Sequence, residues 1–196
     1  MRLINIDSGQ VFLGGKDITD LRLDSLRSHF GYVSQENVLF SRSLAENVAF
    51  GKPGASQEEV ARALKQASLN YEDGTLPSGV ETIVGERGIT LSGGQKQRTA
   101  IARALLIEPP VLVLDDSLSS VDSDTEEAIL EAVRDARSDK TTIIVAHRMT
   151  AVAHADEILV IEDGRVSERG NHEALMAGGG LYATMVRRQE LMEGMQ

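Results

Sequence analysis

Apolar runs that end in polar side chains predict the central strands of this chain. Residues 111–114 form a continuous apolar run followed by Asp115 and Asp116, which is typical of a buried parallel strand. Residues 141–146 contain a second apolar run, which is followed by His147 and predicts another buried strand. Both strands therefore deliver potentially reactive side chains at their carboxyl ends.

One further strand and two hairpins are expected outside these runs. A short strand over residues 31–34 ends at Gln35. Gly14-Gly15 separates two β-forming segments near the N-terminus, and Asp163-Gly164 does the same near the C-terminus. Two helices are expected after the second hairpin, near residues 173–176 and over residues 181–191.

Three sequences of the type Ser-x-x-Glu or Ser-x-x-Gln predict helix starts. In such a capping box the serine and the residue three positions later satisfy each other's free amides. The boxes begin at Ser56, Ser92 and Ser123, the last of these paired with Glu126. Apolar residues recur at helical spacing behind them: Val60, Leu64 and Ala67; Ile101 and Leu105; and Ile129, Val133 and Ala136.

This alternation of strands and helices predicts an α/β fold with a parallel sheet. Carboxylates and an imidazole follow the strands, and in doubly wound sheets ligands bind beyond the carboxyl ends of the strands. No repeat, low-complexity tract or long linker divides the 196 residues, so we expect a single domain.

Composition excludes several classes of function. The formal net charge is −10, and residues 108–139 alone carry ten acidic and two basic side chains, so no nucleic-acid partner is expected. The absence of cysteine excludes disulfides, thiolate zinc sites and a cysteine nucleophile, and it fits a reducing, cytosolic compartment. No apolar run approaches the roughly 20 residues that span a bilayer, so any membrane role is expected to depend on a partner.

Asp115 and Asp116 are candidate metal-binding and catalytic residues. In nucleotide hydrolases one acid at a strand end holds Mg²⁺ while a neighbouring residue orients the attacking water. The simpler alternative is an acidic loop that caps the following helix.

Residues 91–95, with the sequence LSGGQ, form a candidate anion site. Ser92, Gly93, Gly94 and Gln95 stand at a predicted helix start, where free amides and the helix dipole favour a phosphate and the glycines allow close approach. The alternative is that Ser92 only caps its own helix, which is compatible with phosphate binding.

With Lys96-Gln97-Arg98 behind it and the acid-ended strand downstream, LSGGQ resembles the signature motif of ATP-binding cassette (ABC) ATPases. The resemblance covers nearly the whole chain, from about residue 8 to about residue 189. It implies a P-loop NTPase-like parallel sheet and a helical subdomain that carries the signature, here about residues 36–106. It also implies ATP and Mg²⁺ as cofactors.

The resemblance assigns roles to single residues. Gln35 resembles the Q-loop glutamine that reaches Mg²⁺, and Asp115 resembles the Walker B aspartate that binds this metal. Asp116 takes the position of the water-orienting residue, and His147 resembles the switch histidine that contacts the γ-phosphate. Considered singly, Gln35 would be interpreted as a solvated loop residue and His147 as a core histidine, but their order and spacing favour the ABC assignment.

Other residues resemble the parts of the family that face a second subunit. Residues 119–122 resemble the D-loop, in which Ser119 and Asp122 are expected to communicate across a dimer. The signature residues 92–95 are expected to bind, in trans, the ATP held by the partner.

Two further segments favour an exporter. Residues 39–48 resemble the exporter version of the entry to the helical subdomain, and residues 82–88 resemble the X-loop. The expected partners are therefore a second nucleotide-binding domain and the transmembrane domains of an exporter. The expected location is the cytoplasmic face of the cell membrane, through transmembrane domains outside this chain, whereas the isolated chain would be cytosolic.

The sequence departs from the family at the P-loop. No G-x-x-x-x-G-K-[ST] motif is present, and the chain resembles a cassette that begins inside the helix after this loop. We therefore expect the first strand, the P-loop and the chain's own phosphate site to be missing. The chain alone is expected to be inactive or very weakly active and to expose apolar faces.

A second departure is Asp116, which stands where hydrolytic cassettes have glutamate. The side chain is one methylene shorter, which predicts slow or absent hydrolysis at that site. Together with an intact signature, this resembles the non-hydrolysing half of heterodimeric bacterial exporters.

Two alternative functions remain open at this stage. A non-transport ABC ATPase that acts on DNA would need a long heptad-bearing insertion, which this sequence lacks. A non-enzymatic remnant or a partner-binding fragment is the other alternative.

Overall fold

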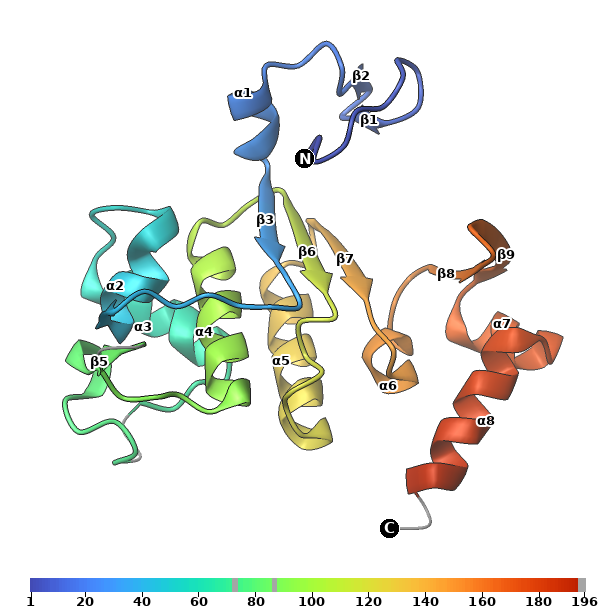
Figure 1. Ribbon diagram of the computed structural model, residues 1–196. Coiled ribbons are helices and arrows are strands. Elements are labelled where there is room, and N and C mark those ends of the chain that lie inside the picture. The colour runs from blue at the N-terminus through green and yellow to red at the C-terminus, as the bar shows by residue number, and fades with distance from the viewer. Residues whose placement is uncertain (72–73, 86–87, 194–196) are drawn as a thin grey trace.

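A three-stranded parallel sheet stands at the centre of the computed structural model, which describes residues 1–71, 74–85 and 88–193 (Figure 1). Its strands lie in the order β3 (Phe30–Val33), β6 (Val111–Asp115) and β7 (Thr141–Val145). Tyr32 pairs with Val113, and Val113 pairs with Ile143. The predicted parallel sheet is confirmed, and the carboxyl ends of its strands meet at one edge.

Helices α4 (Gly93–Leu106) and α5 (Ser123–Ala136) cover one face of this sheet. Leu112 and Leu114 of β6 pack into one core with Ile101 of α4 and Ile129 of α5, and none of the four is more than 1% exposed. Burying an aliphatic side chain of this size contributes about 1.5–3 kcal/mol. This layer therefore fixes β6, and the acids at its end, against the helices.

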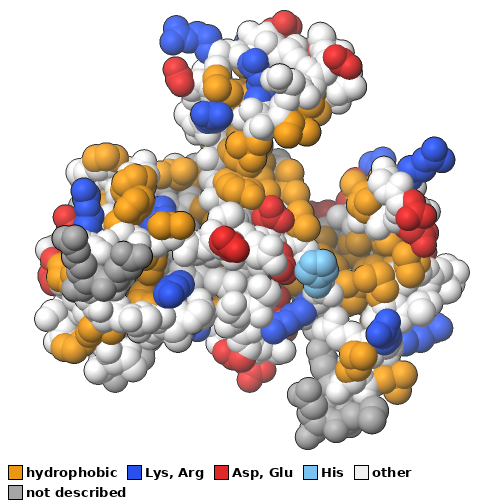
Figure 2. Space-filling view, viewed as in Figure 1, with side chains coloured by type: hydrophobic (Ala, Val, Ile, Leu, Met, Phe, Trp, Pro, Cys, Tyr) orange, Lys and Arg blue, Asp and Glu red, His pale blue; other side chains and the backbone are white. Residues whose placement is uncertain are grey.

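The opposite face of the sheet is open to solvent. Tyr32, Ile143 and Val145 are 40%, 46% and 51% exposed, and Figure 2 shows hydrophobic side chains at the surface over the strands and the C-terminal elements. The prediction of a fully buried strand over residues 141–146 is therefore wrong: the strand forms, but only one side of it is partly covered. An apolar run reports the character of the side chains and not what covers them.

This open face predicts that the chain binds 8-anilino-1-naphthalenesulfonate (ANS) and self-associates as its concentration rises. Replacing Ile143 and Val145 together by threonine should lower the ANS fluorescence, while the free energy of unfolding changes by no more than about 0.5 kcal/mol per site because both side chains are already half exposed. The control Leu112→Ala, in the covered layer, should cost about 2–5 kcal/mol. An unaltered chain that gives no ANS signal would contradict this prediction.

Short helices connect β3 to β6. They are α2 (Leu44–Val48), a 3-10 turn (Ala49–Gly51), α3 (Gln57–Gln66) and a second 3-10 turn (Gly79–Glu81), with β4 (Arg42–Ser43) paired antiparallel to β5 (Ile83–Val84). Helix α3 packs against α4. The predicted capping boxes at Ser56 and Ser92 are confirmed. Within the predicted X-loop, Glu86 and Arg87 lie outside the described residues.

The start of α5 differs from the prediction. Its N-cap is Asp122, whose carboxylate accepts a hydrogen bond from the Thr125 amide at 2.9 Å, so the predicted capping box of Ser123 and Glu126 is wrong. A carboxylate one residue earlier is a strong acceptor that also interacts favourably with the helix dipole. The side chain of Glu126 is buried instead, and Ala136, expected on the buried face, is exposed.

Smaller units stand at both ends of the chain. The N-terminal hairpin, β1 (Phe12–Leu13) and β2 (Lys16–Asp17), precedes α1 (Leu23–Arg27), and both predicted hairpins are confirmed. The C-terminal unit contains α6 (Met149–Val152), β8 (Ile158–Glu162), β9 (Arg165–Gly170), α7 (His172–Gly178) and α8 (Leu181–Glu193). In the described ranges, no helix combines the length and the apolar character needed to cross a bilayer.

Candidate functional site

Three of the predicted site residues meet at the carboxyl edge of the sheet. Gln35 lies two residues beyond β3, Asp115 ends β6 and Asp116 follows it. The Gln35 side-chain amide donates a hydrogen bond to the Asp116 carboxylate at 3.0 Å. This hydrogen bond links two residues that are 81 positions apart in the sequence.

Tyr32 also belongs to this group, although the sequence analysis gave it no role. Its hydroxyl donates a hydrogen bond to the Asp115 carboxylate at 2.9 Å, and this bond is the main cause that raises the pKa of Tyr32. The register of the sheet explains the contact: Tyr32 pairs with Val113, and Asp115, two residues on, points to the same face. Register cannot be read from one strand, so only the paired strands reveal it.

The backbone at Asp116 turns sharply out of the sheet. Its φ is +46°, in the left-handed region that aspartate and asparagine tolerate better than most residues. The Asp116 amide still donates to the carbonyl oxygen of Val145 at 2.8 Å, so the last bond between β6 and β7 is kept. This turn places the carboxylate beyond the end of the strand.

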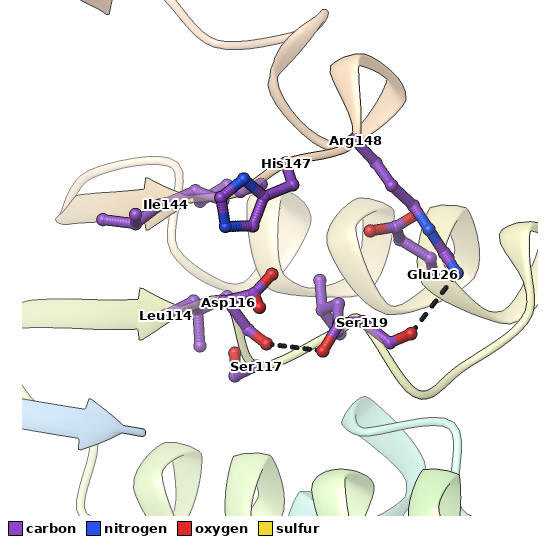
Figure 3. Close-up of a pocket in the computed structure, with 11 residues that line it drawn as sticks. Leu114, Asp116, Ser117, Ser119, Glu126, Ile144, His147 and Arg148 are labelled. Atoms are coloured by element: carbon purple, nitrogen blue, oxygen red, sulfur yellow. Dashed lines mark hydrogen bonds and ion pairs between the residues drawn. The ribbon is translucent and has the colours of Figure 1, made fainter. Parts of the chain in front are cut away.

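His147 lines a small pocket together with Asp116, Ser119, Glu126 and Arg148 (Figure 3). Figure 3 shows His147 and Asp116 at one end of this pocket and the Glu126–Arg148 pair at the other. His147 is exposed, so it is not the core histidine that was the simpler interpretation. Its position, two residues beyond β7, leaves the imidazole accessible to a ligand.

The signature residues form a second group at the start of α4. The Ser92 hydroxyl accepts from the Gln95 amide at 3.2 Å, and the Gln95 side chain accepts from the Ser92 amide at 2.9 Å. Ser92 therefore does cap its own helix, yet Ser92 and Gly93 are exposed at its tip. A side-chain β-carbon at Gly94 would lie 3.3 Å from the carbonyl oxygen of Ser120, which explains why this position suits glycine.

The D-loop residues lie between these two groups. The Ser119 hydroxyl donates to the backbone carbonyl of Asp116 at 3.0 Å. Asp122 caps α5, and its hydrogen bonds from Thr125, first the backbone amide and then the hydroxyl, lower the pKa of the Asp122 carboxyl. Both residues thus have local structural roles, and their expected role across a dimer stays a prediction.

The donor set fits the metal side of an Mg²⁺–nucleotide complex. Mg²⁺ is usually held by one or two carboxylates together with phosphate oxygens and water, and Asp115 and Gln35 provide a carboxylate and an amide oxygen. Across residues 1–71, 74–85 and 88–193, no group of three or more histidine, cysteine or acidic side chains could hold a metal ion by itself.

Comparisons with known proteins point to one family. A family model described as ABC transporter matches residues 1–119. YheI of Bacillus subtilis, named a probable multidrug resistance ABC transporter ATP-binding/permease protein, is 49% identical over 183 residues, which are 93% of this chain and 31% of YheI. A Staphylococcus aureus protein, provisionally named a multidrug export ATP-binding/permease protein, is 45% identical over 190 residues, covering 97% of this chain and 33% of that protein.

A solved structure extends the comparison to the fold. A bacterial Atm1-family ABC exporter with ATP bound matches with a TM-score of 0.84 and 45% identity, over 90% of this chain and 31% of that chain. The chain thus spans about a third of the length of the relatives it matches. The fold class expected from the sequence, an ABC ATPase fold with a parallel sheet, is confirmed. The chain therefore belongs to the ABC transporter family, as a nucleotide-binding domain of the exporter type.

Proposed function

We propose that this chain is the ATP-binding and ATP-hydrolysing part of an ABC exporter and couples these steps to transmembrane export. The observation that carries the proposal is the contact of Gln35 with Asp116 beside Asp115, at the sheet edge where nucleotides bind in this fold class. Its partners would be the transmembrane domains of the exporter and a second nucleotide-binding domain. It would act at the cytoplasmic face of the membrane.

Each residue at the sheet edge would have a separate role in ATP binding and hydrolysis. When MgATP is bound, the nucleotide supplies the phosphoryl group to be transferred, and Mg²⁺ neutralises negative charge on the phosphate oxygens. Asp115 and Gln35 would hold the metal side, and Asp116 would stand in the catalytic position that faces the attacking water, where its carboxylate is one methylene too short to orient this water well. His147, exposed beside Asp116, would donate to an oxygen of the γ-phosphate.

The exposed start of α4 would act on a different nucleotide. Ser92, Gly93, Gly94 and Gln95 would contact the γ-phosphate of ATP bound to the partner subunit, because free amides at a helix start favour an anion. Ser119 and Asp122 would carry contacts across the same dimer interface. Residues 36–106 would form the helical subdomain that moves with the signature, although they share one core with the sheet.

The shorter Asp116 carboxylate supports an asymmetric pair. Withdrawing a water-orienting group by about a bond length weakens catalysis at this chain's own site, whereas LSGGQ is intact. We infer a heterodimer in which this subunit holds ATP with little turnover and its signature serves the hydrolytic site of the partner.

Binding of MgATP tests the proposed function. Residues 1–196 contain no P-loop motif, so this chain should bind MgATP with a Kd of about 1 mM or weaker and show no turnover. A version to which a strand and a P-loop of the ABC type are added ahead of residue 1 should bind at least about tenfold more tightly, measured by isothermal titration calorimetry. Micromolar affinity with turnover in the chain as given would contradict the first expectation, and equal, weak binding by both versions would favour a non-enzymatic fragment.

A further inference from the structure

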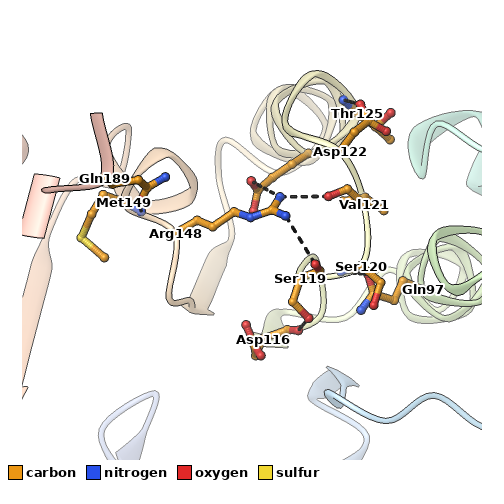
Figure 4. Close-up of polar contacts among 11 residues, drawn as sticks. Gln97, Asp116, Ser119, Ser120, Val121, Asp122, Thr125, Arg148, Met149 and Gln189 are labelled. Carbon is orange, nitrogen blue, oxygen red and sulfur yellow. Dashed lines mark hydrogen bonds and ion pairs between the residues drawn. The ribbon is translucent and has the colours of Figure 1, made fainter. Parts of the chain in front are cut away.

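The segment 119–121 is held from two sides by side chains to which the resemblance gives no role. On one side lies α4, whose first turn carries the signature. On the other side lies Arg148, directly after the candidate switch histidine. Figure 4 shows this segment between Gln97 and Arg148.

Gln97 makes the contact on the α4 side. Its side-chain oxygen accepts a hydrogen bond from the Ser120 amide at 3.0 Å, and the residue is only 4% exposed. The first turn of α4 packs against the same residue, since a β-carbon at Gly93 would lie 3.3 Å from that of Ser120. The segment is therefore tied to the signature helix by a buried hydrogen bond and by close packing.

Arg148 makes the contacts on the switch side. Its guanidinium donates to the carbonyl oxygen of Val121 at 2.9 Å and to that of Ser119 at 3.4 Å. It also pairs with the Glu126 carboxylate at 3.2 Å, and the Glu126 side chain is only 4% exposed. One arginine thus holds two backbone carbonyls and one buried acid.

Met149, the residue after Arg148, links the same segment to the C-terminal unit. The backbone amide of Met149 donates to the side-chain oxygen of Gln189 in α8 at 2.8 Å. The short segment that follows β7 is therefore attached both to α5 and to α8. His147 itself is exposed and sits at the start of this attached segment.

We propose that Gln97 and Arg148 are positioning residues that clamp segment 119–121, so that His147 and Asp116 keep a fixed placement relative to the signature loop of the same subunit. The proposal rests on the proposed function, because it concerns the reaction at the two ATP sites of the dimer. It adds a physical link inside one subunit between residues that serve different sites. Glu126 holds the guanidinium of Arg148 in place.

The chemistry of the contacts explains why an arginine is used. A planar guanidinium can donate to several acceptors in fixed directions at once, whereas a lysine ammonium cannot reproduce this fork. Hydrogen bonds from a charged donor are also stronger than neutral ones. Lysine at position 148 would keep the charge beside Glu126 and lose the geometry.

The first test measures the clamp directly, without ATP, in the chain as given. Gln97→Met removes the acceptor at similar volume, and Arg148→Lys removes the fork. Hydrogen exchange should quicken about tenfold at the Ser120 amide in Gln97→Met and across residues 119–122 in Arg148→Lys. The control is Arg169→Lys. Arg169, on β9, forms an exposed ion pair with Glu157, so this substitution should leave hydrogen exchange in residues 119–122 unchanged. Unchanged exchange in both clamp variants would overturn the proposal.

The second test measures turnover in the full-length exporter with its partner. Arg148→Lys should lower kcat about tenfold while KM changes less than about twofold. The clamped segment also fixes the signature loop, which serves the hydrolytic site of the partner, and misplaced contacts slow the chemical step more than they weaken binding. The double variant Arg148→Met with Glu126→Gln also removes the buried carboxylate of Glu126, so no unpaired charge is left to disturb folding. It should show the same loss of kcat. The Arg169→Lys control should retain full turnover.

The two tests separate the proposal from the proposed function. Faster exchange in the clamp variants, with no turnover even in the unaltered exporter, would support the clamp and contradict the ATPase role. Normal kcat in both Arg148→Lys and the double variant would overturn the positioning role, whatever the exchange data show.

Discussion

Replacing Ser92 by arginine is expected to reduce ATP turnover at least about a hundredfold in the proposed full-length exporter. Ser92 is exposed at the start of α4, where free amides favour an anion. An arginine would fill the space that a γ-phosphate needs and would remove a donor from it. Losing one preorganised donor to developing charge commonly costs about a hundred- to a thousandfold in kcat.

The chain offers a matched control for this variant. Ser56 caps α3 with the same reciprocal box, paired with Glu59, and it is exposed as well. Ser56→Arg therefore removes an equal cap, worth about 1 kcal/mol, without touching the signature. Turnover would be measured by phosphate release and folding by thermal melting. If both variants lost activity equally, or Ser92→Arg lost none, the signature loop would be only a helix cap.

Replacing Asp116 by asparagine is expected to leave steady-state hydrolysis within about twofold of the unaltered rate. The equivalent change of carboxylate to amide at the partner's glutamate should reduce hydrolysis about a hundredfold or more. The two residues serve different ATP sites, and only the longer side chain is expected to orient water. Asparagine tolerates the φ of +46° at this position, and its side-chain oxygen can still accept from Gln35. The backbone should therefore stay undisturbed, and any loss would be chemical.

Both variants would be compared by phosphate release in the same membrane preparation. A symmetric result, in which Asp116→Asn alone reduces turnover as severely as the partner variant, would contradict the heterodimer. A homodimer with two equivalent sites would then be the better interpretation. The unaltered pair provides the reference rate.

Local features could be predicted from the sequence because their partners lie within a few residues. The capping boxes at Ser56 and Ser92, the turns at Gly14-Gly15 and Asp163-Gly164, and a strand at the apolar run 111–114 all form as expected, the strand ending at Asp115. Family resemblance also selected Gln35 and Asp116, which the structure brings into contact. The failed capping box at Ser123 was a choice between neighbouring acceptors, which pattern alone does not rank.

The pairing of distant residues and the exposure of each face depend on how the elements pack together. Tyr32 reaches Asp115 across 83 residues because β3 and β6 are in register, and Arg148 reaches Glu126 across 22 residues because the end of β7 passes the first turn of α5. The exposure of Ile143 and Val145 likewise depends on what lies over the sheet. The helices and strands that the sequence pattern predicts follow from short-range hydrogen bonding and periodicity, whereas the roles of the candidate residues follow from the resemblance to ABC ATPases. Register, burial and long-range pairing arise only when the folded chain brings separate elements together.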